Sequence, residues 1–155
     1  MSIRAGIDVD GVIASFFSIY EAATRQITGR DLFPPRAGDE PPLYWNWPQH
    51  AGYTEEEMSR VWTWIKTHPE FWLDAPVMRG AVGLLEIVPC GADVYFITDR
   101  PGLGAKLKTE AWLRVMLPMF QYRVMPTVLI SRSGQKGLLA KGLCLTHFIE
   151  DKLEN

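Results

Sequence analysis

Four short apolar runs, each ending in polar residues, recur along the chain. Such runs are typical of buried parallel strands, which are covered on both faces and show little alternation. Longer amphipathic segments separate them, and this alternation of strand and helix predicts βαβ units and an α/β fold with a parallel sheet. The predicted strands are 3–8, 93–98, 127–131 and 145–149.

The segments between the strands carry helix signals. In 14–27, apolar positions recur at three- and four-residue steps, and Gly29 follows as a stop signal. Thr54 and Glu57 form a capping-box pattern at the start of a helix predicted over 55–67. The remaining helices are predicted near 80–88, at 104–117 and at 136–141.

Residues 31–53 differ in character from the rest. Prolines interrupt a cluster of aromatic residues there, which predicts a packed but irregular segment. The stretch 14–78 as a whole is far longer than a crossover between neighbouring strands needs. Most of it is therefore expected to form a small helical cap within a single domain, whose core would comprise 1–13 and 79–155.

Polar residues of one chemical theme follow three of the predicted strands. In open parallel sheets, active sites collect at the carboxyl ends of the strands. Lys136 begins the helix that leads into the last strand and could reach the same place. The residues at the strand ends are Asp8 and Asp10, then Thr98, Asp99 and Arg100, and finally Glu150 and Asp151.

These residue types suit the transfer of a phosphoryl group. The Asp8 carboxylate is already anionic and can attack phosphorus, forming an aspartyl-phosphate without first losing a proton. Asp10 can protonate the leaving oxygen and later activate water, as a general acid and base. The Thr98 hydroxyl and the Lys136 ammonium can hold phosphate oxygens that gain charge in the transition state. Lys141 is an alternative to Lys136.

The same residues create an electrostatic difficulty. Carboxylates from Asp8, Asp10, Glu150 and Asp151 at one cleft would repel a phosphate dianion. A hard divalent cation, which prefers oxygen ligands, would remove this repulsion. The sequence therefore predicts Mg²⁺ as the cofactor.

Four segments of the chain resemble, in the same order, the four motifs of the haloacid dehalogenase superfamily of phosphohydrolases. They are DVDGV at 8–12, FIT at 96–98, Lys136 and FIED at 148–151. The resemblance implies a Rossmann-like three-layer α/β/α core with strand order 3-2-1-4 and a helical cap after the first strand. It also implies the metal ligands, namely the Asp8 carboxylate, the Asp10 backbone carbonyl and an acid from Glu150 and Asp151. Many relatives have two aspartates in the last motif, so Glu150 departs from the pattern.

Within the superfamily, the segment DVDGVIASF at 8–16 resembles the start of the 5'(3')-deoxyribonucleotidases and their bacterial and phage relatives. In that subgroup the phenylalanine of the motif stacks on the nucleobase, which implies that Phe16 contacts the substrate. Trp45 and Trp47 could complete an aromatic sandwich. Arg100 is a further candidate contact, although it fits a turn equally well. The expected substrate is a (deoxy)nucleoside monophosphate, with its base and sugar left open.

Composition and charge narrow the partners. The 155 residues, 47% of them hydrophobic, suffice for one core with an insertion. A net charge of −2 makes duplex nucleic acid an unexpected partner. No apolar run approaches the ~20 residues of a membrane span, so no membrane association is expected and the predicted location is the cytoplasm.

Cys90 and Cys144 are expected to be buried, reduced thiols. The oligomeric state is not predicted.

Three alternative functions stay open on the sequence. The same residues could serve a sugar phosphatase, or a phosphatase acting on nucleic-acid ends, which the lack of a basic stripe disfavours. They could also belong to a phosphate-binding or phospho-acceptor module without turnover. Response regulators, however, place their acid pair before a phospho-accepting aspartate on a later strand, whereas here the acid pair itself comes first with Asp8 as its candidate nucleophile.

Overall fold

A parallel sheet of four strands lies at the centre of the protein. The computed structural model describes residues 2–35, 42, 46–117, 126–132 and 134–151. The strands are ordered β3-β2-β1-β4, and all three pairings are parallel. This confirms the predicted α/β class and the strand order 3-2-1-4. The bounds are Arg4–Asp8 for β1, Asp93–Thr98 for β2, Thr127–Ile130 for β3 and His147–Ile149 for β4.

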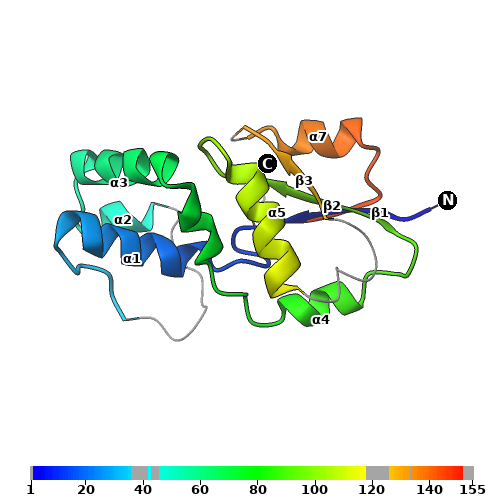
Figure 1. The fold of residues 1–155 in the computed structure, drawn as a ribbon, viewed down its shortest axis with the longest axis horizontal. Helices are drawn as coiled ribbons and strands as arrows, with labels where there is room; N and C mark the ends of the chain where they lie inside the picture. The colour runs from blue at the N-terminus through cyan, green and yellow to red at the C-terminus, as the bar shows by residue number, and fades with distance from the viewer. Residues whose placement is uncertain (1, 36–41, 43–45, 118–125, 133, 152–155) are drawn as a thin grey trace.

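Helices cover both faces of this sheet. The chain moves from β1 to β2 to β3 in one direction and then returns past them to β4. Because parallel crossovers are right-handed, the helix of the returning crossover must lie on the opposite face from the others. Figure 1 shows α4 and α7 on opposite sides of the sheet. The helices concerned are α4 (Ala81–Glu86), α5 (Ala105–Met116) and α7 (Lys136–Gly142).

Between β1 and α4, the chain forms a second group of helices beside the sheet (Figure 1). The two ends of this segment lie side by side, since Met78 N donates to Ile13 O at 2.9 Å and Ser15 N donates to Pro76 O at 2.8 Å. This pairing supports our proposal that a cap of about 14–78 is inserted into a core of 1–13 and 79–155. The group contains α1 (Phe16–Thr28), α2 (Trp47–His50), α3 (Glu55–Thr67) and the 3₁₀ helix η1 (Pro69–Leu73).

Some expectations from the sequence need correction. The segment 31–53, expected to be irregular, contains the short helix α2, in which Pro48 occupies the first turn, where its missing N–H costs nothing. Cys90 and Cys144, expected to be buried, are exposed free thiols. Both lie in the turns that precede β2 and β4, and not in the apolar strands themselves.

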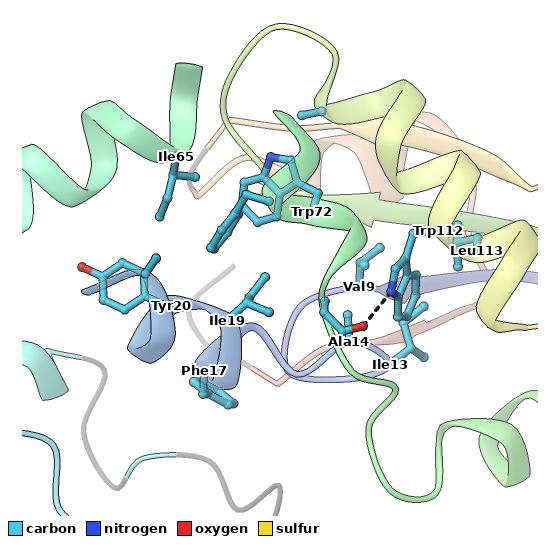
Figure 2. Close-up of a cluster of buried hydrophobic side chains, with 14 of the residues drawn as sticks. Val9, Ile13, Ala14, Phe17, Ile19, Tyr20, Ile65, Trp72, Trp112 and Leu113 are labelled. Atoms are coloured by element: carbon cyan, nitrogen blue, oxygen red, sulfur yellow. Dashed lines mark hydrogen bonds between the residues drawn. The ribbon is translucent and has the colours of Figure 1, made fainter. Parts of the chain in front are cut away.

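The two groups of helices share one hydrophobic core. Figure 2 shows its buried side chains, which run from Tyr20 and Ile65 of the inserted helices to Val9 and Trp112 beside the sheet. Trp112 of α5 is fully buried, and its Nε1 donates to the backbone oxygen of Ala75 at 2.7 Å. This bond anchors the returning chain to α5. No helix among the described residues is both long and apolar enough to cross a membrane.

Helix α3 begins with the predicted capping box. Thr54 Oγ1 accepts from the Glu57 amide at 3.2 Å, and Glu57 Oε2 accepts from the Thr54 amide at 2.8 Å. Arg30 Nη1 donates to Glu57 Oε1 at 2.6 Å. The bond from the Thr54 backbone, followed by the one from Arg30, lowers the pKa of Glu57 to about 2. The two bonds of the capping box satisfy amides that the start of a helix otherwise leaves unpaired.

Replacement of Thr54 by alanine should destabilise the protein. We expect Thr54→Ala to lower the free energy of unfolding by about 1 kcal/mol, because the helix loses its cap. Thr63→Ala is the matched control, since Thr63 is exposed in the middle of α3 and alanine favours helices. Urea unfolding of the three proteins measures the difference. Equal losses in both variants would contradict the importance of the cap.

Candidate active site

Asp8 ends β1 and lies almost fully buried at the carboxyl edge of the sheet. The ammonium of Lys136, the first residue of α7, lies 2.6 Å from Asp8 Oδ2, and the Val9 amide donates to Oδ1 at 2.6 Å. The same ammonium lies 3.1 Å from Glu150 Oε1 and 3.0 Å from Oε2. Lys136 is 4% exposed, whereas Lys141, in the last turn of α7, is exposed. Of the two candidate lysines, the structure therefore places Lys136 against Asp8.

The charges of this cluster do not balance. Burial, and then a hydrogen bond with Glu150, raise the pKa of Asp8 to about 9, while the Lys136 ammonium acts in the opposite direction. Burial also opposes the charged form of Glu150, but its bonds with Asp8, Asp151 and Lys136 leave the pKa of Glu150 lowered. A single ammonium does not compensate the carboxylates of Asp8 and Glu150 together. A second cation at this place would favour the charged form of Asp8.

Three carboxyl groups converge here. Oxygen atoms of Asp8, Glu150 and Asp151 all lie within 4.8 Å of one another. Glu150 Oε2 is buried and accepts no hydrogen bond, although it is within ion-pair distance of Lys136. The Asp151 carboxylate lies directly over Gly11, where a Cβ atom would collide with it. This set of oxygen donors, one of them buried and without a hydrogen bond, fits a hard divalent cation such as Mg²⁺.

The Asp10 carboxylate is held by different partners. Arg100 Nη2 donates to Asp10 Oδ1 at 2.8 Å, and Arg100 Nε donates to Oδ2 at 3.0 Å. Thr98 Oγ1 donates to the same Oδ2 at 3.1 Å. The hydroxyl predicted to bind phosphate thus bonds to Asp10 here, and its phosphate role stays a prediction. Metal ligation by the Asp10 backbone carbonyl also stays a prediction.

A cavity of about 620 Å³ lies over these residues. Its lining has two parts, one from the strand ends and one from the inserted helices. The polar part includes Asp8, Asp10, Thr98, Asp99, Arg100, Lys136 and Asp151. The apolar part includes Phe16, Tyr20, Trp47, Pro48, Met58, Trp62 and Trp72. Among the predicted substrate contacts, Phe16, Trp47 and Arg100 line the cavity, whereas Trp45 lies outside the described residues.

The aromatic side chains of the wall pack on one another. Phe16 lies nearly parallel to Trp62 and to Trp72, with ring centroids 5.9 and 6.3 Å away and interplanar angles of 18° and 23°. Tyr20, one turn further along α1, lies 5.3 Å from Phe16 and from Trp62. Sequence reasoning missed Tyr20 and Met58 as wall residues. The four-residue spacing of Phe16 and Tyr20 was a sequence signal for Tyr20. The sequence held no signal for Met58, because its position depends on how α3 docks against α1.

Comparison with known proteins identifies the fold. No family model matches the chain, and no curated protein matches it. A Lactobacillus plantarum protein with the provisional description phosphoglycolate phosphatase is 15% identical, with a TM-score of 0.57 over 99% of this chain and 80% of the other. A haloacid dehalogenase-like family hydrolase from Streptococcus pneumoniae is 13% identical, with a TM-score of 0.57 over 98% of this chain and 77% of the other.

A third solved structure is a HAD family hydrolase from Deinococcus radiodurans with bound phosphate and sodium. It is 13% identical, with a TM-score of 0.52 over 99% of this chain and 74% of the other. Identities this low concern the fold alone. The chain therefore has the fold of the haloacid dehalogenase-like hydrolases, with the sequence-predicted acids at its carboxyl edge.

Gly11 provides a test of the carboxylate group. Its φ of +85° and the neighbouring Asp151 leave no room for a side chain, so Gly11→Ala should displace Asp151. We expect the variant to bind Mg²⁺ about 10- to 100-fold more weakly, measured by the rise in melting temperature with added Mg²⁺. Gly91→Ala is the control, since Gly91 has a φ of +90° and open space around it. Similar Mg²⁺ affinities in the two variants would argue against Asp151 as a ligand.

Proposed function

We propose that this protein is a Mg²⁺-dependent phosphomonoester hydrolase in which Asp8 is the nucleophile. The observation that carries the proposal is the contact of Asp8 with Lys136 inside a group of three carboxyl groups, on the wall of a cavity. Asp10 lies on the same wall. A nucleophile, a cation for phosphate, a metal-ligand set and a second acid are thus near one another.

Asp8, Glu150 and Asp151 would hold the Mg²⁺ ion, together with the Asp10 backbone carbonyl that the family resemblance implies. The ion supplies positive charge that offsets the repulsion between these carboxylates and a phosphate dianion. Glu150 Oε2, which is buried and has no partner besides its ion pair with Lys136, supports this assignment. Glu150 has one methylene more than the aspartate common among relatives, and its carboxylate lies within reach of Lys136.

In the first step, an oxygen of Asp8 attacks phosphorus and the ester P–O bond breaks on the opposite side. Asp10 gives its proton to the leaving oxygen, which departs as an alcohol. Lys136 and Thr98 bind phosphate oxygens as their charge rises. The product of this step is an aspartyl-phosphate on Asp8.

In the second step, Asp10 is a carboxylate and accepts a proton from a water molecule. The resulting hydroxide attacks phosphorus, and the bond between phosphorus and Asp8 breaks. Inorganic phosphate leaves, while Asp8 returns as a carboxylate and Asp10 is again protonated. One carboxyl group therefore serves both as acid and as base, which requires that it stay beside the phosphorus throughout.

A (deoxy)nucleoside monophosphate is the substrate that we propose first. The apolar wall of Phe16, Tyr20, Trp47 and Trp62 supports it, because aromatic surfaces bind flat bases by stacking. A base would lie against this wall while the phosphate reaches Asp8. Stacking is indifferent to base identity, so this wall offers affinity and little choice among bases.

A sugar phosphate is the second candidate, and one observation favours it. Phe16 already packs against Trp62 and Trp72, so its ring has less surface to offer a base. The amide side chains of Asn46 and Gln49 also line the cavity and could bind hydroxyl groups.

Removal of the nucleophile should abolish turnover. We expect Asp8→Asn to lower kcat at least about a thousandfold, because an amide cannot form the aspartyl-phosphate. Release of phosphate from p-nitrophenyl phosphate with Mg²⁺ measures it. Asp31→Asn is the control, since Asp31 is an exposed partner of Arg25 on the inserted segment. Wild-type activity in Asp8→Asn would refute the mechanism.

The substrate class can be tested with a panel of phosphates. We expect nucleoside 5'-monophosphates to be hydrolysed with a higher kcat/KM than glycerol 3-phosphate or hexose phosphates, owing to stacking on the aromatic wall. Trp47→Leu should then raise KM for nucleotides and leave KM for sugar phosphates nearly unchanged. Activity confined to sugar phosphates would exclude the nucleotidase proposal while leaving the chemistry of Asp8 intact.

A further inference from the structure

Arg100 is the charged side chain with the most enclosed position near the site. Its side chain is 0% exposed, and its guanidinium lies over the ring of Trp72, 4.7 Å from the centroid. Trp112 lies at 5.9 Å from the same guanidinium. One indole comes from η1, where the inserted helices return, and the other from α5. Arg100 is thus held by apolar surfaces from both parts of the protein.

Every nitrogen of this guanidinium has a hydrogen-bond acceptor. Nε and Nη2 donate to the Asp10 carboxylate at 2.8 to 3.2 Å, and Nη1 donates to Thr109 Oγ1 at 3.1 Å. The Thr109 hydroxyl donates in turn to the backbone oxygen of Ala105. Arg100 is therefore fixed from behind by α5 and directs its fork at one carboxylate. A substrate contact, as expected from the sequence, would need it to give up these bonds.

We infer that Arg100 is a positioning residue, which holds the carboxyl group of Asp10 in the orientation that transfers its proton to the leaving oxygen. The inference rests on the proposed function. Asp10 lies just past the end of β1, and its side chain is 21% exposed, so without partners it would sample several rotamers. The fork of an arginine holds both carboxylate oxygens at once, which a lysine does not. Thr98 holds one of the same oxygens.

If Arg100 positions Asp10, the loss of kcat/KM in a variant depends on the leaving group, whereas a purely structural role predicts no such dependence. An alcohol leaves from phosphorus only with a proton, which Asp10 supplies, whereas p-nitrophenolate leaves without one near neutral pH. The ratio kcat/KM reports the steps up to release of the alcohol, before water attacks. A misplaced Asp10 should therefore lower kcat/KM for alkyl phosphates and spare it for p-nitrophenyl phosphate. A general loss of structure would lower both.

The test compares Arg100→Lys with the wild type on these two kinds of substrate. For the alkyl phosphate of the panel that the wild type hydrolyses fastest, we expect kcat/KM to fall about tenfold to a hundredfold. For p-nitrophenyl phosphate we expect a change within about threefold, since no proton transfer is lost. Asp10→Asn should show the same selectivity, and the double variant should lose little more. Arg60→Lys is the control for replacing an arginine by a lysine, since Arg60 is an exposed residue of α3.

A second variant tests the same inference if Arg100→Lys does not fold. Thr109→Val removes only the hydroxyl behind the guanidinium and keeps the shape of the side chain, and it should show a smaller loss with the same selectivity. Equal losses on both substrates, in an active enzyme, would overturn the role of Arg100 alone. A wild type without Asp8-dependent turnover would overturn the proposed function and this inference with it.

Discussion

Two buried cations hold together the carboxyl edge of the sheet, and the rest of the molecule depends on them. Asp8 and Asp10 leave β1 two residues apart, and neither carboxylate can be enclosed there without an opposite charge. Lys136 compensates the first from α7, and Arg100 compensates the second from the loop after β2. Each cation arrives by a different crossover, so both crossovers must be in place before the edge is stable. The same two crossovers are therefore needed both for a stable fold and for the candidate site.

The aromatic side chains extend this requirement to the inserted helices. Trp72 contacts the Arg100 guanidinium and also packs against Phe16 of α1. Trp112, the second indole near Arg100, is tied to the backbone of Ala75, where the chain returns to the sheet. The helices thus dock through residues that also enclose the ion pair. A shift of these helices would loosen the pocket around Asp10 as well as the hydrophobic core.

The sequence predicted the features that depend on local rules. The capping box at Thr54 gave the bounds of α3, and the apolar run of β2 was recognised with its ends. Motif order led to Lys136, which the structure places against Asp8. The short α2 and η1 were missed because a single turn carries no periodicity. The role of Arg100 was hidden because its partners are set by tertiary packing: the sequence places Arg100 in a turn and cannot bring two distant indoles to it.

The two parts of the cavity wall constrain a ligand to different degrees. Around Asp8 and Lys136, each charge needs a partner of opposite sign at a set distance, so few chemistries fit. On the apolar side, Phe16 and Trp62 already pack on one another, and dispersion does not distinguish flat groups. If the proposed hydrolase distinguishes leaving groups, the distinction must therefore come from polar atoms at the wall, such as the amides of Asn46 and Gln49. In the proposed function, selectivity and chemistry therefore depend on different elements, which can change independently.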